Sequence, residues 1–401
     1  MALSRRSLIQ GGIAGSVALG AALRSDSASA TPTIPETFPF HGSHQPGVLR
    51  VPAPAATMAT FDVLSTSVDD LRQLMVTITQ RARLLSIGGR MTSDGPTAPE
   101  ADSLVLGPDA PSGELTITIG LGASLFDQRF GLGPKMPKLL KPMPVFPDDA
   151  IVPDLTHGDV SLLIQASTTD VVHHALRDIT RHTRAGMQPR WMISATNAPS
   201  RPDGAPRNLL GFKDGTANPD VNDANGMDQL VWVPHGGAEQ AWAAGGTYQV
   251  VRIIRMLVEF WDRVSLKEQE NMFGRRKASG APLDGQVESD APRYERDPGG
   301  TIIPLDAHIR LANPRTPDTA NNRILRRGFT YDHGLDSNGQ LDVGLLFTCY
   351  QQDLVRQFET VQRRLAGEPL VDYISPIGGG YFFVPPGVRD ADDFIASGLF
   401  G

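Results

Sequence analysis

Hydrophobic and polar residues alternate along this chain in two patterns that follow one another. Short apolar runs predict strands, and longer stretches with apolar residues at positions i, i+3, i+4 and i+7 predict helices with one buried face. Four times along the chain, an apolar run that predicts a strand is followed by a stretch that predicts an amphipathic helix. The predicted strands span residues 59–64, 160–166, 248–257 and 343–350.

Each predicted strand is followed by a predicted amphipathic helix. The third helix opens at Ser265, and Glu268 three residues later completes a capping box. The other three helices are marked by apolar residues at helical spacing, namely Leu71, Leu74, Met75, Ile78, Ala82 and Leu85, then Val172, Ala175, Leu176 and Ile179, then Leu354, Phe358, Val361 and Leu365.

The four strand–helix units fall into two pairs, with starts roughly a hundred residues apart. Two units per half predict a duplicated α+β fold, in which helices pack on the faces of antiparallel sheets. We place the N-terminal domain at 58–210 and the C-terminal domain at 211–401, after an extended arm at 31–57. Residues 274–306 predict a long surface excursion, and loops of that length are commonly functional.

Composition and charge exclude several classes of protein. The chain has 401 residues and a net charge of −7, which argues against an electrostatic nucleic-acid binder. The single cysteine, Cys349, excludes an internal disulfide and any multi-cysteine metal site.

The first thirty residues have the pattern of an export signal. Arg5 and Arg6 precede a small, apolar run at 11–23, and Ala28-Ser29-Ala30 fits a cleavage site. Paired arginines before such a run predict a twin-arginine signal peptide at 1–30 and a periplasmic or secreted protein, with a membrane anchor as the alternative. Because this route carries proteins that are already folded, we expect a bound cofactor.

Three separated positions are candidates for chemistry. Asp214 lies between glycines at 211 and 215, in a turn that can bring backbone close to a ligand. His308 precedes an arginine-rich stretch that contains Arg326. Taken singly, a glycine-flanked aspartate is often only a turn, and a lone histidine is more often a surface residue than a ligand.

Taken together, these residues resemble the dye-decolourising (DyP-type) haem peroxidases, and among them the exported, EfeB-like deferrochelatase/peroxidase branch. Residues 211–215 match the G-x-x-D-G motif of the family, His308 its haem ligand and Arg326 its arginine. The runs 280–283 and 378–383 match as well, and the resemblance covers nearly all of the chain after the signal.

The resemblance implies a duplicated, dimeric-ferredoxin-like fold that holds one haem b per chain, mainly in the C-terminal unit. His308 would bind the iron on the proximal side, and Asp214 and Arg326 would lie on the distal side. Phe347 would face the distal pocket, or else belong to ordinary strand core. The other implied haem contacts are Gly215, Thr216, Ala217, Asn313, Pro314 and Arg315.

These residue types suit a peroxidase. Histidine supplies the one axial ligand that haem iron needs, and a carboxylate commonly holds its other nitrogen; Asp306 is adjacent in sequence, but the partner is not identified. Asp214 can act as general base and then general acid on hydrogen peroxide. Arg326 can stabilise negative charge on the departing oxygen.

Alternative functions remain open at this point. The first is a deferrochelatase, which would release iron from haem and leave the porphyrin intact. The second is a non-enzymatic haem carrier, for which Asp214 and Arg326 would be dispensable. A serine hydrolase is disfavoured because no G-x-S-x-G motif occurs.

The resemblance also implies partners. They are hydrogen peroxide, a small reducing donor or dye, a ferrous-iron permease system and a second copy of the chain in a homodimer. We expect no nucleic acid among them and no transmembrane anchor after signal cleavage.

Overall fold

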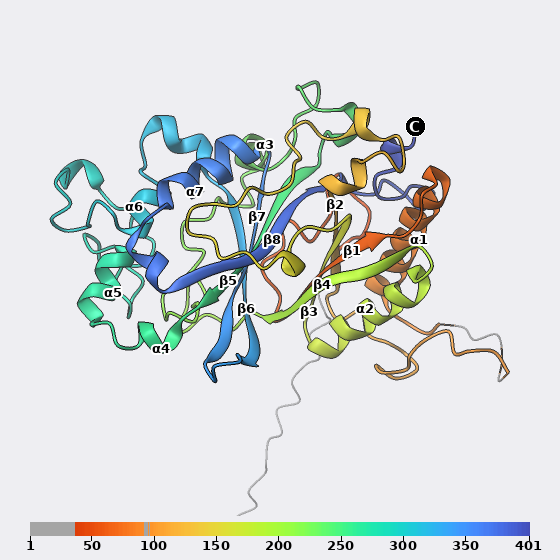
Figure 1. Cartoon of the computed structure of the whole chain (residues 1–401), viewed down its shortest axis with the longest axis horizontal. Coiled ribbons are helices and arrows are strands. Elements are labelled where there is room, and N and C mark those ends of the chain that lie inside the picture. The colour runs from red at the N-terminus through yellow and green to blue at the C-terminus, as the bar shows by residue number, and fades with distance from the viewer. Residues whose placement is uncertain (1–36, 92–94, 96) are drawn as a thin grey trace, which may run out of the picture. The chain divides into compact units, whose positions relative to one another are not determined.

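Eight strands close into an antiparallel barrel in the computed structural model (Figure 1), in the order β1-β3-β2-β8-β5-β7-β6-β4. The strands are β1 (Ala55–Val63), β2 (Thr116–Gly122), β3 (Val160–Ala166), β4 (Met187–Thr196), β5 (Thr247–Met256), β6 (Leu325–Leu335), β7 (Leu341–Gln351) and β8 (Ile374–Val384).

The structure describes residues 37–91, 95 and 97–401. The predicted signal peptide at 1–30 lies outside the described residues, as does the beginning of the predicted arm. No helix within the described part of the chain is long and apolar enough to cross a membrane.

The barrel consists of two copies of one strand order. In the first half the neighbours are β4, β1, β3 and β2, and in the second half β8, β5, β7 and β6 are neighbours in the same relative order. In the first half, helix α1 (Val68–Ile87) follows β1 and helix α2 (Thr169–Thr183) follows β3. The predicted duplicated ferredoxin-like α+β fold is therefore confirmed.

The second half carries more segments between its strands. Helices α4 (Val258–Trp261), α5 (Leu266–Phe273) and α6 (His308–Ala312) separate β5 from β6, and α7 (Thr360–Leu365) lies between β7 and β8. A further helix, α3 (Ala224–Leu230), precedes β5. Figure 1 shows α1 and α2 beside the strands of the first half, and α4 to α7 gathered around those of the second.

The two halves join along two short seams. Strand β2 pairs with β8 only at Leu121 and Gly122. Strand β4 pairs with β6 only at Ala195 and Thr196, opposite Tyr331 and Thr330. Because the second seam is so short, no strand in the described part of the chain pairs with the β4-facing edge of β6 before Thr330.

Side chains fill the interior of the barrel. Strand residues point alternately to the two faces of a sheet, so every second residue of each strand enters this core. The buried cluster takes residues from both halves, among them Met58, Leu163, Trp191, Ile253, Phe329, Leu346 and Phe382. The interior of the barrel is therefore a packed core, and the cavity described below lies on its outer face.

Four of the eight strands match the predicted runs, namely β1, β3, β5 and β7. The predicted helices correspond to α1, α2, α5 with its Ser265–Glu268 capping box, and α7. The pattern missed β2, β4, β6 and β8. Strand β1 begins at Ala55, inside the predicted arm, and Val48 of that arm is buried. The domain boundary at 210/211 stays a prediction.

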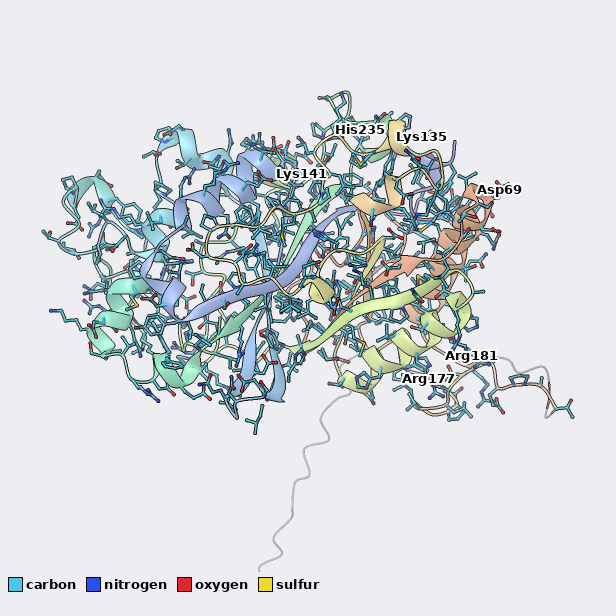
Figure 2. The ribbon with its side chains drawn as sticks, viewed as in Figure 1. Asp69, Lys135, Lys141, Arg177, Arg181 and His235 are labelled. Carbon is cyan, nitrogen blue, oxygen red and sulfur yellow. The ribbon has the colours of Figure 1, made fainter. Side chains whose placement is uncertain are left out.

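The segment before α7 is a π-helical turn (Leu354–Glu359). Its Glu359 carboxylate is buried and pairs with Lys141 at 2.7 Å and with Arg363 at 3.1 Å. Lys141 is labelled in Figure 2, which also shows Arg177 and Arg181 on the exposed face of α2. The two ion pairs fix the turn that carries Phe358 to the cavity described below.

Replacing Gly379 with alanine tests the packing of β8. Gly379 has φ +118°, and a Cβ there would overlap the carbonyl oxygen of Val251 on β5. We expect Gly379→Ala to lower the free energy of unfolding, measured by chemical denaturation, by more than the roughly 1–3 kcal/mol of backbone strain alone.

Gly339→Ala is the matched control. Gly339 has φ +77° but nothing within 4 Å of its Cβ position, so it reports the strain without the overlap. An equal loss of stability in both variants would contradict the close packing of β8 against β5.

Candidate functional site

A cavity lies on the outer face of the second half of the barrel. Arg326, Ile254 and Phe347 point into it, whereas their neighbours Ile253 and Leu346 point into the barrel core. Helices α5, α6 and α7 contribute its other walls. The unfilled space is about 1800 Å³ including the open mouth.

His308 is the first residue of α6 and lines this cavity. Its Nδ1 lies 2.8 Å and 3.0 Å from the two carboxylate oxygens of Glu368. The Glu368 side chain is only 3% exposed. Burial disfavours the imidazolium, but the charge and hydrogen bond of Glu368 outweigh burial, so the pKa of His308 is raised above 6.5.

The hydrogen bond to Glu368 leaves one imidazole nitrogen for another partner. Because Nδ1 faces a carboxylate, it carries the proton, and Nε2 has a free lone pair when the ring is neutral. Within the described part of the chain, no group forms a hydrogen bond with Nε2. An imidazole held in this way is suited to bind a metal through Nε2.

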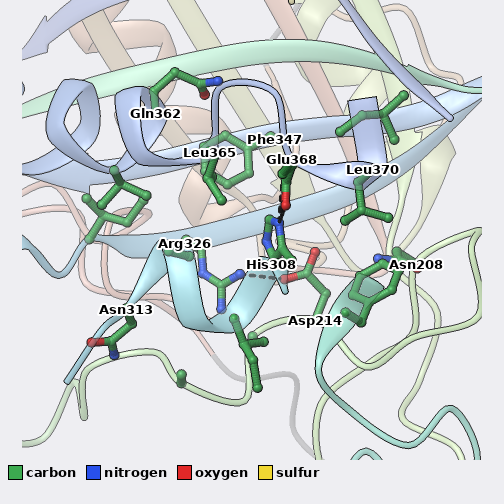
Figure 3. A pocket seen from close by; sticks show the side chains of 18 of the residues that line it. Asn208, Asp214, His308, Asn313, Arg326, Phe347, Gln362, Leu365, Glu368 and Leu370 are labelled. Atoms are coloured by element: carbon green, nitrogen blue, oxygen red, sulfur yellow. Dashed lines mark hydrogen bonds and ion pairs between the residues drawn. The ribbon is translucent and has the colours of Figure 1, made fainter. Parts of the chain in front are cut away.

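Asp214 and Arg326 form an ion pair in the same cavity. Arg326 Nη1 donates to Asp214 Oδ1 at 2.9 Å, and both side chains are 27% exposed. Figure 3 shows Asp214, Arg326 and His308 facing the same space, with Glu368 behind the histidine. Asp214 comes from the loop before β5 and Arg326 from β6, so tertiary structure brings them together.

The loop at 211–219 is held tightly. Gly211 and Gly215 have φ values of +86° and +112°, which favour glycine, as the sequence predicts. Pro206 O accepts the Asp214 N–H at 2.8 Å. These features turn the Asp214 carboxylate toward the cavity, where it lines the wall.

Glu288, from the long segment at 274–306, ties down the same loop. Its carboxylate pairs with the Lys213 ammonium and accepts the Thr216 hydroxyl at 2.8 Å and the Ala205 N–H at 2.9 Å. Burial alone would raise the pKa of Glu288, but these partners outweigh it and lower the pKa. Glu288 thus fixes the residues on both sides of Asp214.

Three arginines line part of the cavity, and one of them, Arg275, comes from the segment at 274–306. Arg275 is 6% exposed, and its guanidinium donates to the carbonyls of Gly280 and Glu288. Burial lowers its pKa, the sign of a desolvated cation. Arg315 and Arg323 line the cavity too, and within the described residues none of the three arginines forms an ion pair with a carboxylate.

Most of the predicted site residues meet at this cavity. Those that line it are Asp214, Gly215, Thr216, Ala217, His308, Asn313, Arg315, Arg326 and Phe347. Pro314 is not among the lining residues. Asp306, adjacent to the histidine in sequence, is exposed, and the carboxylate partner of His308 is Glu368 instead.

Sequence reasoning missed Glu368, Glu288, Asn218 and Arg275. Glu368 lies 60 residues after His308, and no spacing in the sequence connects the two. Arg275 and Glu288 lie in the long excursion at 274–306, where the length of the segment and the family match at 280–283 were signals of a function but neither named these two residues. Asn218 stands within the singled-out run at 211–219, but only the contacts of its side chain show what it does.

The two halves of the chain match models of one family. Residues 45–195 match the model described as Dyp-type peroxidase, N-terminal, and residues 205–389 match Dyp-type peroxidase, C-terminal. The deferrochelatases of Yersinia pestis and of Escherichia coli (strain K12) are each 48% identical to this chain over 410 residues, which is 99% of this chain and 94% and 96% of theirs.

Solved structures of the same family are similar. A DyP-type peroxidase from Streptomyces coelicolor is 35% identical, with a TM-score of 0.81 over 91% of this chain and 97% of that chain. One from Cellulomonas bogoriensis is 33% identical, with a TM-score of 0.81 over 91% and 98% of the two chains.

Asp297 makes the segment at 274–306 sensitive to acid. Its carboxylate accepts the N–H groups of Thr301, Ile302 and Ile303 at 2.7–3.1 Å. The hydrogen bonds from these amides and from the Thr301 hydroxyl outweigh partial desolvation and lower its pKa from 3.8 to about 2. Because the folded-state pKa is depressed, this contribution to stability is present above about pH 4 and is lost as the pH falls toward about 2.

We therefore expect Asp297→Asn to be less stable than the parent protein near neutral pH, with a difference that shrinks between about pH 4 and about pH 2. Denaturation at a series of pH values measures it. Glu295→Gln, an exposed acid two residues away, is the control. A stability difference that is independent of pH would contradict the role of the Asp297 carboxylate.

Proposed function

The chain belongs to the Dyp-type peroxidase family, and on that premise we propose that it is a haem b enzyme that reduces hydrogen peroxide and oxidises a small donor or dye. One haem per chain would occupy the cavity. The observation that carries this proposal is the Asp214–Arg326 ion pair at 2.9 Å, which faces the same cavity as His308, whose Nε2 has no hydrogen-bond partner among the described residues.

The cavity offers what each part of a haem requires. The porphyrin ring is apolar, and Ile254, Leu345 and Phe347 supply apolar walls. The two propionates are carboxylates, and Arg275 and Arg315 are lining cations without a carboxylate partner among the described residues. The iron needs an axial ligand, which Nε2 of His308 can supply. The donor set therefore fits the group.

Glu368 supports the ligand role of His308. A carboxylate at Nδ1 fixes the tautomer and the orientation of the imidazole and raises its donor strength. Replacing it with a neutral acceptor would weaken that effect. Haem iron bound by one histidine supplies the redox chemistry by which peroxide is reduced and a donor is oxidised.

Asp214 is the residue that would move a proton. Arg326 occupies its Oδ1, and no group of the described chain hydrogen-bonds to its Oδ2. That oxygen can take a proton from one oxygen of hydrogen peroxide and return it to the other, as general base and then general acid.

Arg326 would stabilise the negative charge that develops during the reaction. A guanidinium carries its charge at any working pH, so it can stabilise negative charge as it develops on the departing oxygen. Its position beside Asp214 lets proton transfer and charge stabilisation take place on the same peroxide. The two side chains thus have separate tasks in one small volume.

A second candidate function is the release of iron from haem with the porphyrin left intact. The observation in its favour is the 48% identity to proteins named deferrochelatase. It would use the same cavity. Incubating the protein with hemin and measuring metal-free porphyrin by its fluorescence tests this activity separately. A non-enzymatic haem carrier is disfavoured, because a carrier gains little from the Asp214–Arg326 pair.

The twin-arginine pattern supports export to the periplasm after removal of residues 1–30. The ferrous-iron permease partner, the homodimer and the one-to-one haem stoichiometry stay predictions as well. Each rests on the family resemblance.

The roles of Asp214 and Arg326 are separable by mutation. We expect Asp214→Asn to slow peroxide reduction by roughly 10²–10⁴-fold, because proton transfer is lost. We expect Arg326→Leu to slow it by roughly 10²–10³-fold, the scale of lost charge stabilisation. Stopped-flow absorbance of the haem-loaded protein with hydrogen peroxide measures both rates.

Asp220→Asn is the matched control, since Asp220 is exposed and lies in the same segment. His308→Ala is expected to lose haem rather than rate alone. Wild-type rates in both Asp214→Asn and Arg326→Leu would contradict the roles proposed for these two residues, whereas a parent protein that binds haem but does not reduce peroxide would favour a haem carrier. An unimpaired Asp214→Asn beside an inactive Arg326→Leu would assign the chemistry to the arginine alone.

A further inference from the structure

Strand β4 pairs with only a small part of the neighbouring edge of β6, the edge that includes Arg326. In an antiparallel sheet the N–H and C=O of every second residue point to the same neighbour. On β6 the residues that face β4 are Thr330, Gly328 and Arg326, but β4 pairs only with Thr330 and Tyr331. The backbone groups of Gly328 and Arg326 therefore need other partners.

Two asparagine side chains supply partners in place of β4. Asn197, the first residue after β4, donates its Nδ2 to Gly328 O at 3.5 Å. Asn218 makes a pair of bonds at Arg326, since its Nδ2 donates to Arg326 O at 3.0 Å and its Oδ1 accepts Arg326 N–H at 3.0 Å. The side-chain amide of Asn218 thus makes the two backbone hydrogen bonds that a neighbouring strand would make. It does so at Arg326, whose side chain lines the cavity.

Asn218 stands in the same loop as Asp214. A backbone bond from Asn218 N–H to Gly215 O at 3.0 Å closes the intervening turn. Pro219 follows, and a residue before proline is restricted to extended backbone, which limits the directions its side chain can take. The loop is therefore joined to β6 twice, by Asn218 to the backbone of Arg326 and by Asp214 to its guanidinium.

We propose that Asn218 is a positioning residue for the peroxide reaction, which sets the distance between the Asp214 carboxylate and the Arg326 guanidinium by clamping the Arg326 backbone to the Asp214 loop. The inference rests on the proposed function. Asn218 touches neither substrate nor haem in this role and acts through Arg326 alone. A shift of about 1 Å in such a group can cost about 100-fold in rate.

The test compares haem-loaded Asn218→Ala with Asn197→Ala, which removes an amide from the same edge two residues from Arg326. In Asn218→Ala we expect the peroxide rate to fall roughly 10- to 100-fold, with the KM for the donor and the haem content unchanged. Hydrogen exchange gives a readout apart from activity, because the Arg326 amide should exchange at least about tenfold faster. Asn197→Ala should change neither quantity.

A double-mutant cycle separates positioning from general damage. If Asn218 acts through Arg326, adding Asn218→Ala to Arg326→Leu should lower the rate by less than about twofold. A full additional loss in the double variant would overturn the inference. If Asn218→Ala does not fold, Asn218→Asp replaces it in every comparison. Aspartate keeps the size of the side chain and the acceptor for Arg326 N–H, but it lacks the donor to Arg326 O.

The outcomes also separate this inference from the proposed function. A slow Arg326→Leu beside a wild-type rate in the Asn218 variant would overturn the positioning role and leave the peroxidase proposal standing. A wild-type rate in Arg326→Leu would remove the role of the arginine itself, and the positioning role of Asn218 with it.

Discussion

Closure of the barrel is the constraint on which the arrangement of the site depends. The eight strands place every second side chain in a core that is already filled, so the opposite set must face outward. On the second half of the barrel, that outward set builds one wall of a cavity. Successive residues of β6 point to opposite faces, so Arg326 faces this cavity and Arg327 points the other way. Arg327 is 5% exposed.

The charges around the cavity are unevenly matched. The two carboxylates with a role in the proposed chemistry are already paired: Glu368 with His308, and Asp214 with Arg326. Three lining arginines have no such partner among the described residues. Of these three, only Arg275 is buried, and a buried cation without a counter-charge is costly; Arg315 and Arg323 are exposed. A ligand that carries carboxylates would pair with these arginines, which agrees with the proposed haem.

Much of the fold could be predicted from the sequence, because the most regular segments show their periodicity directly. Strands β1, β3, β5 and β7 are buried along most of their length and contain recognisable apolar runs, since both faces are covered. Strand β8 contains three glycines that admit neighbouring backbone, and β6 places arginine beside arginine, so neither has the composition of a strand. Their identity depends on tertiary pairing that no local pattern records.

The candidate site was predictable in part for the same reason. Asp214, His308 and Arg326 stand in recognisable motifs, and the structure brings them to one cavity. Glu368 and Asn218 act through hydrogen bonds across 60 and 108 residues of sequence. Glutamate and asparagine occur at many surface positions, so only the fold distinguishes these two.

The central claim is that His308, strengthened by Glu368, holds the haem iron. Resonance Raman spectroscopy of the ferrous, haem-loaded protein measures the stretching frequency of the bond between iron and imidazole. The account predicts this band in the parent protein and a lower frequency in Glu368→Gln, because a neutral amide accepts the Nδ1 proton less strongly. An identical frequency in the two proteins, or a band that persists in His308→Ala, would contradict it.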